Sequence, residues 1–146
     1  MKTYVVDSSV AIKWYIPEKW SIEAVEWLES ANKKGYRLLA PDLIFPEIGS
    51  VLWKKCRKGE LAAEDARKIL SAMDEAFPVK VVGSAPLLPA AFEIARAFNR
   101  SVYDSLYLAL AKAKGGILVT ADLRLVNALQ DTVLGTAVLF LGKQAQ

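Results

Sequence analysis

Short, nearly continuous apolar runs alternate along the chain with longer segments of helical periodicity, and this alternation limits the fold more than any other feature. The runs YVVD at 4–7 and ILVT at 117–120 are typical of parallel strands buried on both faces. The other predicted strands are RLLA at 37–40, VKVV at 79–82 and VLFL at 138–141. Strands separated by helices indicate an α/β fold with a central parallel sheet and helices on both sides.

The segments between the predicted strands carry helix start and stop signals. Pro46 stands in a first turn, Gly35 and Gly59 follow expected helix ends, and Pro17 ends the first helix. The predicted helices cover 9–16, 21–35, 46–59, 62–77, 88–98, 102–114 and 122–129. Because no repeat or linker interrupts the pattern, we expect a single domain over 1–146.

The chain has no histidine and one cysteine, Cys56, and this restricts its chemistry. Histidine-dependent triads, histidine metal sites, structural zinc sites and internal disulfides are all excluded. Carboxylates are therefore the expected catalytic groups of an enzyme, and a metal held by oxygen alone would be magnesium, manganese or calcium. We expect a cytoplasmic protein, since no run approaches the roughly 20 apolar residues of a membrane span and no signal-peptide pattern follows Met1.

Four acidic residues stand at or near the carboxyl ends of predicted strands, where ligands of open α/β sheets bind. They are Asp7 at the end of the first strand, Glu47 in the first turn of the third helix, Asp104 near the start of the sixth helix, and Asp122 two residues after the fourth strand. Each has a structural alternative, because Asp7 and Asp122 could cap helices and Glu47 favours a helix dipole.

Asp104 lies in a helix with few other polar side chains. A buried carboxylate without a partner costs several kcal/mol or shifts its pKa. Arg100 is four residues upstream but outside the expected helix, so either a cation from elsewhere compensates or Asp104 lines a cleft. The net charge is +3, so the four acids would stand in a body that otherwise carries +7, which fits a metal site acting on a polyanion.

Four motifs stand in order over nearly the whole chain: YVVDSSVAIKW at 4–14, PEIGSVLWK at 46–54, SVYDSLYLALA at 101–111 and LVTADLRL at 118–125. In these motifs the sequence resembles the PIN-domain ribonucleases, specifically the VapC-type toxins of toxin–antitoxin operons. The resemblance implies a three-layer α/β/α PIN-like fold with a central parallel sheet. It also implies cleavage of RNA phosphodiester bonds that depends on Mg²⁺ or Mn²⁺.

The resemblance also implies roles for individual residues. The catalytic positions are Asp7, Glu47, Asp104 and Asp122. The three aspartates would be direct or water-mediated metal ligands, and Glu47 a ligand or the group that orients the attacking water. Ser9 and Thr120 match hydroxyl positions beside the acids. Four carboxylates could hold two ions, or one ion and a base.

The family implies further partners: a homodimer and a small VapB-like antitoxin that blocks the cleft. Lys13 and Trp14 follow the first motif and are candidate RNA contacts, since tryptophan can stack on an unpaired base. A core position for Trp14 is the alternative. The densest basic group, KKCRK at 54–58, is interpreted as a solvated helix end.

Other classes of protein also begin with a strand that ends in an aspartate. A haloacid-dehalogenase-like phosphatase needs a second aspartate at position 9, where this chain has Ser9. A phospho-receiver domain needs an adjacent acidic pair, whereas Ser8 follows Asp7. A PIN-fold RNA- or protein-binding regulator without catalytic turnover keeps the four acids and stays open as the alternative to a nuclease.

Overall fold

The computed structural model describes residues 1–144, in which five parallel strands form one central sheet. The strands are β1 (Thr3–Val6), β2 (Arg37–Pro41), β3 (Lys80–Val82), β4 (Ile117–Thr120) and β5 (Val138–Phe140). Their order is β3-β2-β1-β4-β5, and every neighbouring pair is parallel. This confirms the predicted parallel sheet, with β1 at its centre between β2 and β4.

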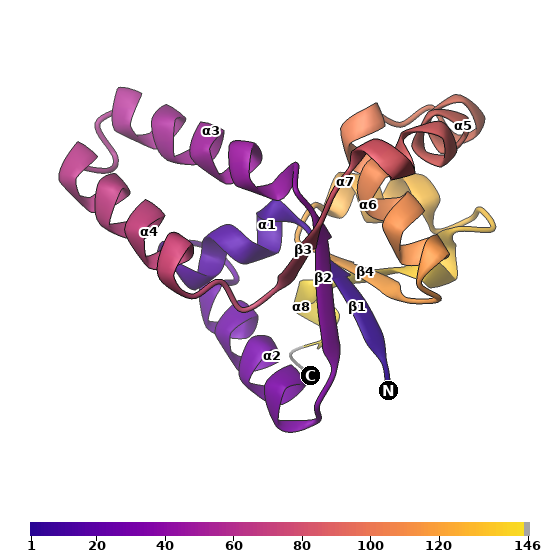
Figure 1. Ribbon diagram of the computed structural model, residues 1–146, viewed down its shortest axis with the longest axis horizontal. Coiled ribbons are helices and arrows are strands. Elements are labelled where there is room, and N and C mark those ends of the chain that lie inside the picture. The colour runs from indigo at the N-terminus through magenta and orange to yellow at the C-terminus, as the bar shows by residue number, and fades with distance from the viewer. Residues whose placement is uncertain (145–146) are drawn as a thin grey trace.

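The helices lie on both sides of the sheet, as predicted. In Figure 1, α1 to α4 lie to the left of the strands, and α5, α6 and α7 lie to the right. The helices are α1 (Ser8–Ala11), α2 (Ser21–Lys33), α3 (Ile44–Arg57), α4 (Ala63–Glu75), α5 (Leu88–Phe98), α6 (Val102–Ala113), α7 (Leu123–Leu129) and α8 (Leu141–Gln144). Short 3₁₀ turns cover Ile12–Trp14, Ala85–Leu87 and Gly135–Ala137.

Most element boundaries lie within two residues of the sequence-based prediction, and three of the differences have a clear physical reason or change the type of element. The helix expected at 9–16 is divided into α1 and a 3₁₀ turn, the tighter geometry that is common at helix ends. Helix α3 begins at Ile44, two residues before Pro46, whose missing N–H costs nothing in a first turn. Leu141, predicted as the last residue of a strand, begins α8 instead.

The packing of helix α6 against the sheet explains why its sequence is so apolar. It contacts β1, β2 and β4, and every residue from Ser105 to Ala111 is buried. Asp104 lies in the first turn of the helix, just before this buried stretch, and is itself half-buried. Asp104 therefore stands at the border between the buried core and the edge of the sheet at which the strands end.

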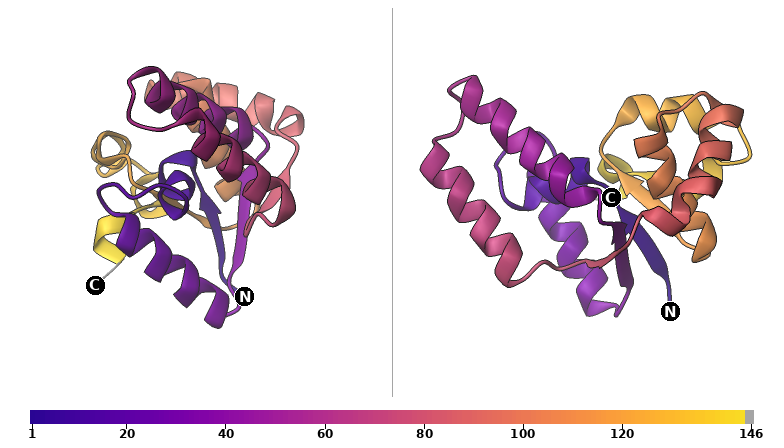
Figure 2. Two further views of the ribbon diagram at one scale, coloured as in Figure 1. Left: turned by 90° about the vertical axis from the view of Figure 1, so that its left-hand side faces the viewer. Right: turned by 45° about the horizontal axis from the view of Figure 1, so that its top comes forward.

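The α3–α4 hairpin extends to one side of the sheet (Figure 2). Its basic segment is exposed at Lys54, Arg57 and Lys58, in agreement with a solvated helix end. Among the described residues, no helix is both long and apolar enough to cross a membrane. The predicted single domain over 1–146 includes residues 145–146, which lie outside the described residues, and it stays a prediction.

Candidate active site

The carboxyl ends of β1 and β4 bring acidic residues to one edge of the sheet. Asp7 follows β1 directly and caps α1, and Asp122 follows β4 and caps α7. Because β1 and β4 are parallel neighbours, Val6 pairs with Val119 and the two aspartates leave the sheet at the same edge. Both residues are therefore helix caps that also lie at the edge where a site is expected, so the two interpretations of the sequence do not exclude each other.

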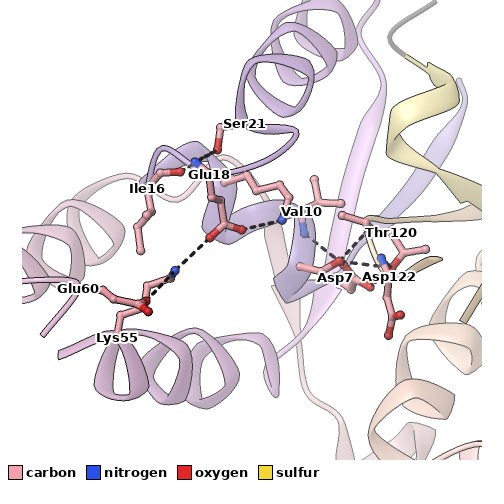
Figure 3. A network of polar contacts seen from close by, with 12 residues as sticks. Asp7, Val10, Ile16, Glu18, Ser21, Lys55, Glu60, Thr120 and Asp122 are labelled. Carbon is pink, nitrogen blue, oxygen red and sulfur yellow. Dashed lines mark hydrogen bonds and ion pairs between the residues drawn. The ribbon is translucent and has the colours of Figure 1, made fainter. Parts of the chain in front are cut away.

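Asp7 is buried and bonded on both carboxylate oxygens. Ser9 Oγ donates to its Oδ1 at 2.5 Å, Thr120 Oγ1 donates to its Oδ2 at 2.5 Å, and the Val10 amide donates to Oδ1 at 3.3 Å (Figure 3). Burial raises the pKa of Asp7 to about 6, against the lowering effect of these hydrogen bonds, and the charge of Glu47 adds to the rise. A carboxylate held this way is costly to ionise without a cation.

The hydroxyls of Ser9 and Thr120 tie Asp7 to the segment that carries Asp122. Ser9 Oγ accepts a hydrogen bond from the Ala121 amide at 2.9 Å, and Thr120 Oγ1 accepts one from the Asp122 amide at 3.0 Å. Each hydroxyl thus donates to Asp7 and accepts from the β4–α7 turn. The two positions that the family resemblance singled out as supporting residues lie where they fix the spacing of two acids.

Glu47, in the first turn of α3, lies beside Asp7 and is held at one oxygen. Tyr107 Oη donates to its Oε1 at 2.5 Å, and Ser8 Oγ donates to the same atom at 3.2 Å. Burial, and then the hydrogen bond and charge of Glu47, raise the pKa of Tyr107, so this phenol stays protonated as a donor.

Tyr107 was not predicted as a site residue from the sequence. It follows Asp104 by three residues, so both side chains lie on one face of α6. That spacing could have indicated that the Tyr107 hydroxyl lies near the acids. Its hydroxyl is the polar end of an otherwise apolar core residue that is 3% exposed.

Asp104 and Asp122 form the second pair of acids. Burial raises the pKa of Asp104, and the negative charge of Asp122 raises it further. The positive charge of Arg100, which lies just before the helix, opposes this rise. The Ser101 hydroxyl caps α6 by accepting from the Asp104 amide at 3.0 Å.

The donor set fits a hard divalent cation, because it consists of carboxylate and hydroxyl oxygens only. The acids stand as two interacting pairs, Asp7 with Glu47 and Asp104 with Asp122. Within residues 1–144, no three carboxylates converge tightly enough to enclose a metal ion. A metal held by three of them would therefore need side-chain rotation or bridging waters, which magnesium commonly retains.

The two predicted RNA contacts have other partners in the structure. Trp14 donates its indole N–H to the Ala24 carbonyl at 3.1 Å, and its ring packs against Phe77. This favours the alternative interpretation of Trp14 as a packing residue. Lys13 forms a 2.7 Å ion pair with Glu18, and its side chain is 10% exposed.

The sequence and fold of this chain are similar to those of known proteins. The PIN domain family matches residues 4–128. Ribonuclease VapC3 of Pyrobaculum aerophilum is 37% identical over 84% of this chain and 92% of its own length. Two crystal structures share the fold. PAE2754 from P. aerophilum has a TM-score of 0.71 at 23% identity, covering 99% of this chain and 87% of its own. VapBC2 from Rickettsia felis, bound to a promoter DNA fragment, has a TM-score of 0.65 at 13% identity, covering 94% and 98%.

The chain belongs to the PIN-domain family, whose three-layer α/β/α fold the model shows. Within that family it is a ribonuclease of the VapC type. This confirms the family, fold class and ribonuclease activity expected from the sequence, and it removes the phosphatase and phospho-receiver alternatives.

Proposed function

We propose that this chain cleaves RNA internally as the toxin of a toxin–antitoxin pair, with Asp7, Glu47, Asp104 and Asp122 as its catalytic residues. The observation that carries the proposal is one edge of the sheet with two interacting pairs of acids, Asp7 with Glu47 and Asp104 with Asp122, where Asp7 is buried with a pKa raised to about 6. Such an arrangement is costly for the fold alone, and perturbed carboxylates of this kind cluster at functional sites.

The proposal includes Mg²⁺ or Mn²⁺ held by Asp7, Asp104 and Asp122, directly or through water. When bound, the ion lowers the pKa of a water molecule and neutralises charge on the reacting phosphate. The chain itself supplies the positioning: Ser9 and Thr120 hold Asp7, and the caps of α6 and α7 hold the segments of the other two aspartates.

Glu47 is proposed to orient the attacking water. Both of its hydrogen-bond donors meet Oε1, so Oε2 is left to face the reacting groups. Tyr107 is then a positioning residue, because it acts on the substrate only through Glu47. Its phenol keeps its proton at all working pH values, so its hydrogen bond to Glu47 does not switch off.

Replacing Tyr107 by phenylalanine is expected to lower kcat about 10-fold with little change in KM, because Glu47 loses the donor that fixes its rotamer. Tyr103→Phe on the same helix is the matched control, since Tyr103 is 61% exposed. Equal kcat and KM values for both variants would remove Tyr107 from the site.

Partners are part of the same proposal. We infer a VapB-like antitoxin, a homodimer and a cytoplasmic location for a single PIN domain. Large apolar side chains that stand exposed on the chain, Trp53 at 62% and Phe92 at 53%, support partner surfaces. The Rickettsia felis VapBC2 structure, a solved complex with the same fold, gives further support.

An RNA- or protein-binding regulator without turnover is the alternative function, and Asp104→Asn separates the two. For the nuclease we expect cleavage of a mixed RNA pool to fall at least about 100-fold, since the ion and its ligands supply several kcal/mol of charge stabilisation, while RNA binding is kept. The matched control is Asp65→Asn at the tip of the α3–α4 hairpin, which should cleave normally. Wild-type cleavage that persists in EDTA, or equal cleavage by Asp104→Asn, would contradict the proposal.

A further inference from the structure

A cavity of about 440 Å³ lies beside the segment that carries Asp122 and takes no part in the chemistry described above. Ala121 and Leu123, the two chain neighbours of Asp122, form one part of its wall. Their Cα atoms stand about 3.8 Å from that of Asp122, because that is the spacing of consecutive residues. The cavity therefore opens directly beside a catalytic position.

The strand register also places this cavity at the catalytic edge of the sheet. Phe140, another wall residue, ends β5 and pairs with Thr120, the residue that ends β4. The Thr120 hydroxyl donates to Asp7, so β4 alone separates the strand of Phe140 from the strand that ends at Asp7. A molecule in the cavity would thus lie at the same edge of the sheet as the acids.

The remaining wall is aromatic and basic. Trp20 meets Phe140 edge to face, with ring centroids 5.7 Å apart, and Lys19 Nζ lies 5.4 Å from the centroid of the Trp20 ring. Gly142 closes the far edge of the aromatic pair, because a Cβ there would come within 2.6 Å of Phe140 and 3.1 Å of Trp20. The two rings are therefore held in place by a residue with no room for a side chain.

Trp20 adopts a backbone conformation that a bulky residue rarely takes. Its φ is 73°, in the left-handed region, where glycine or asparagine would cost less free energy. A strained residue of this kind persists when the surrounding structure holds it there, and such residues cluster at ligand sites. A tryptophan therefore lines the cavity although its backbone conformation there is strained.

The charge of the cavity favours an anion. Lys13 and Glu18 neutralise each other in the wall at 2.7 Å, and Glu18 is bound on its other oxygen by Lys55 at 3.4 Å (Figure 3). Lys19 lies over the Trp20 ring and supplies the net positive charge of the lining. Because Lys19 is exposed, its ammonium can leave the ring for an anion. An aromatic surface beside such a cation matches the base and the phosphate of a nucleotide.

We propose that this cavity binds one unpaired nucleotide of the RNA substrate, next to the scissile phosphate, with its base against Trp20 and its phosphate facing Lys19. The inference rests on the proposed ribonuclease function and names a subsite for that substrate. The volume suits a mononucleotide, since ligand sites of about 300–1,000 Å³ hold small molecules. Stacking accepts any base, so the subsite selects single-stranded RNA rather than a particular sequence. Trp20 thus takes the role that the sequence suggested for Trp14.

The test measures the binding of fluorescein-labelled hexa-adenylate RNA in EDTA, where cleavage plays no part. Trp20→Leu is expected to weaken binding about 5- to 20-fold, the effect of losing one stacked base. Lys19→Gln is expected to weaken it about 3-fold and to reduce the dependence of log K on log salt by about 0.7, the share of one phosphate contact on a single strand. Trp53→Leu and Lys58→Gln, which replace exposed residues outside the cavity, are matched controls.

The subsite proposal would be overturned if both cavity variants bound the RNA with the same affinity as their controls. It would also be overturned if the wild type did not bind at millimolar RNA. If Trp20→Leu fails to fold by circular dichroism, Lys19→Gln and its salt dependence decide, because Lys19 is exposed. Failure of the subsite is distinguishable from failure of the ribonuclease. In the first case, metal-dependent cleavage still depends on Asp104 while the cavity variants bind normally. In the second, no variant alters cleavage even though RNA binding weakens.

Discussion

Replacing Asp7 by asparagine is expected to abolish metal-dependent RNA cleavage, with a loss of at least about 100-fold in kcat/KM. Asparagine has nearly the same shape and can still accept from Ser9 and Val10, so the helix cap of α1 should survive. What disappears is the negative charge at the centre of the sheet edge. Without that charge a divalent ion loses a ligand, and a carboxylate ligand is the type that Mg²⁺ prefers.

The measurement is cleavage of a mixed RNA pool by pure protein in Mn²⁺, Mg²⁺ or EDTA, with Asp65→Asn as the control that keeps the fold and alters a distant acid. Cleavage that requires metal and is lost only in Asp7→Asn would establish the reaction and its central acid together. Equal cleavage by both variants would mean that the activity comes from a contaminant or from another site. Absence of cleavage by the wild type on a broad pool would favour the regulator without turnover.

The same replacement is expected to stabilise the protein in the absence of metal. Burial raises the pKa of Asp7 from 3.8 to about 6, so the folded state holds a proton that the unfolded state releases. Between pH 3.8 and about 6 the free energy of unfolding of the wild type falls as the pH rises. Above the folded-state pKa the full free-energy cost of burying the ionised carboxylate is present. At pH 7.5 that cost is about 3 kcal/mol, and asparagine, which never ionises, avoids it.

Thermal unfolding in EDTA at pH 4, 5.5 and 7.5 measures this effect. The melting temperatures of wild type and Asp7→Asn should be close at pH 4 and separate as the pH rises, with the variant higher. Millimolar Mg²⁺ or Mn²⁺ should raise the melting temperature of the wild type and leave the variant nearly unchanged, since the ion neutralises the charge that burial penalises. A variant that melts below the wild type at pH 7.5 in EDTA would show that Asp7 serves the fold and not a bound cation.

Much of the fold could be predicted because it depends on local patterns. The central strands are buried on both faces, so their apolar runs mark them directly, as in ILVT at 117–120. Helix ends at Gly35 and Gly59 follow from the left-handed backbone conformation, with φ of 68° and 74°, that glycine adopts at low cost. Boundaries were less certain where two geometries compete, as in the helix predicted at 9–16, whose second half is a 3₁₀ turn.

The four acids could be proposed as site residues from the sequence because each stands in a motif of its own. The motifs together resemble one family, and the absence of histidine leaves carboxylates as the expected catalytic groups. Their pairing could not be predicted, since Asp7 with Glu47 and Asp104 with Asp122 stand on different elements, whose packing no local pattern specifies. Tyr107 was missed for the same reason: in sequence it is one more core residue of α6, and only the approach of α3 gives its hydroxyl a partner.

The sequence by itself determined the parallel α/β class and the family, because periodicity and motif spacing are properties of neighbouring residues. Only the tertiary structure decided which tryptophan packs inward, which one lines the cavity beside Ala121 and Leu123, and what each acid contacts. Trp14 turns inward to the Ala24 carbonyl, whereas Trp20 stands against Phe140 at the end of β5. The physical reason is that a side chain's surroundings are set by strand register and helix packing, which join residues more than 100 positions apart, as Asp7 and Thr120 are joined by one hydrogen bond.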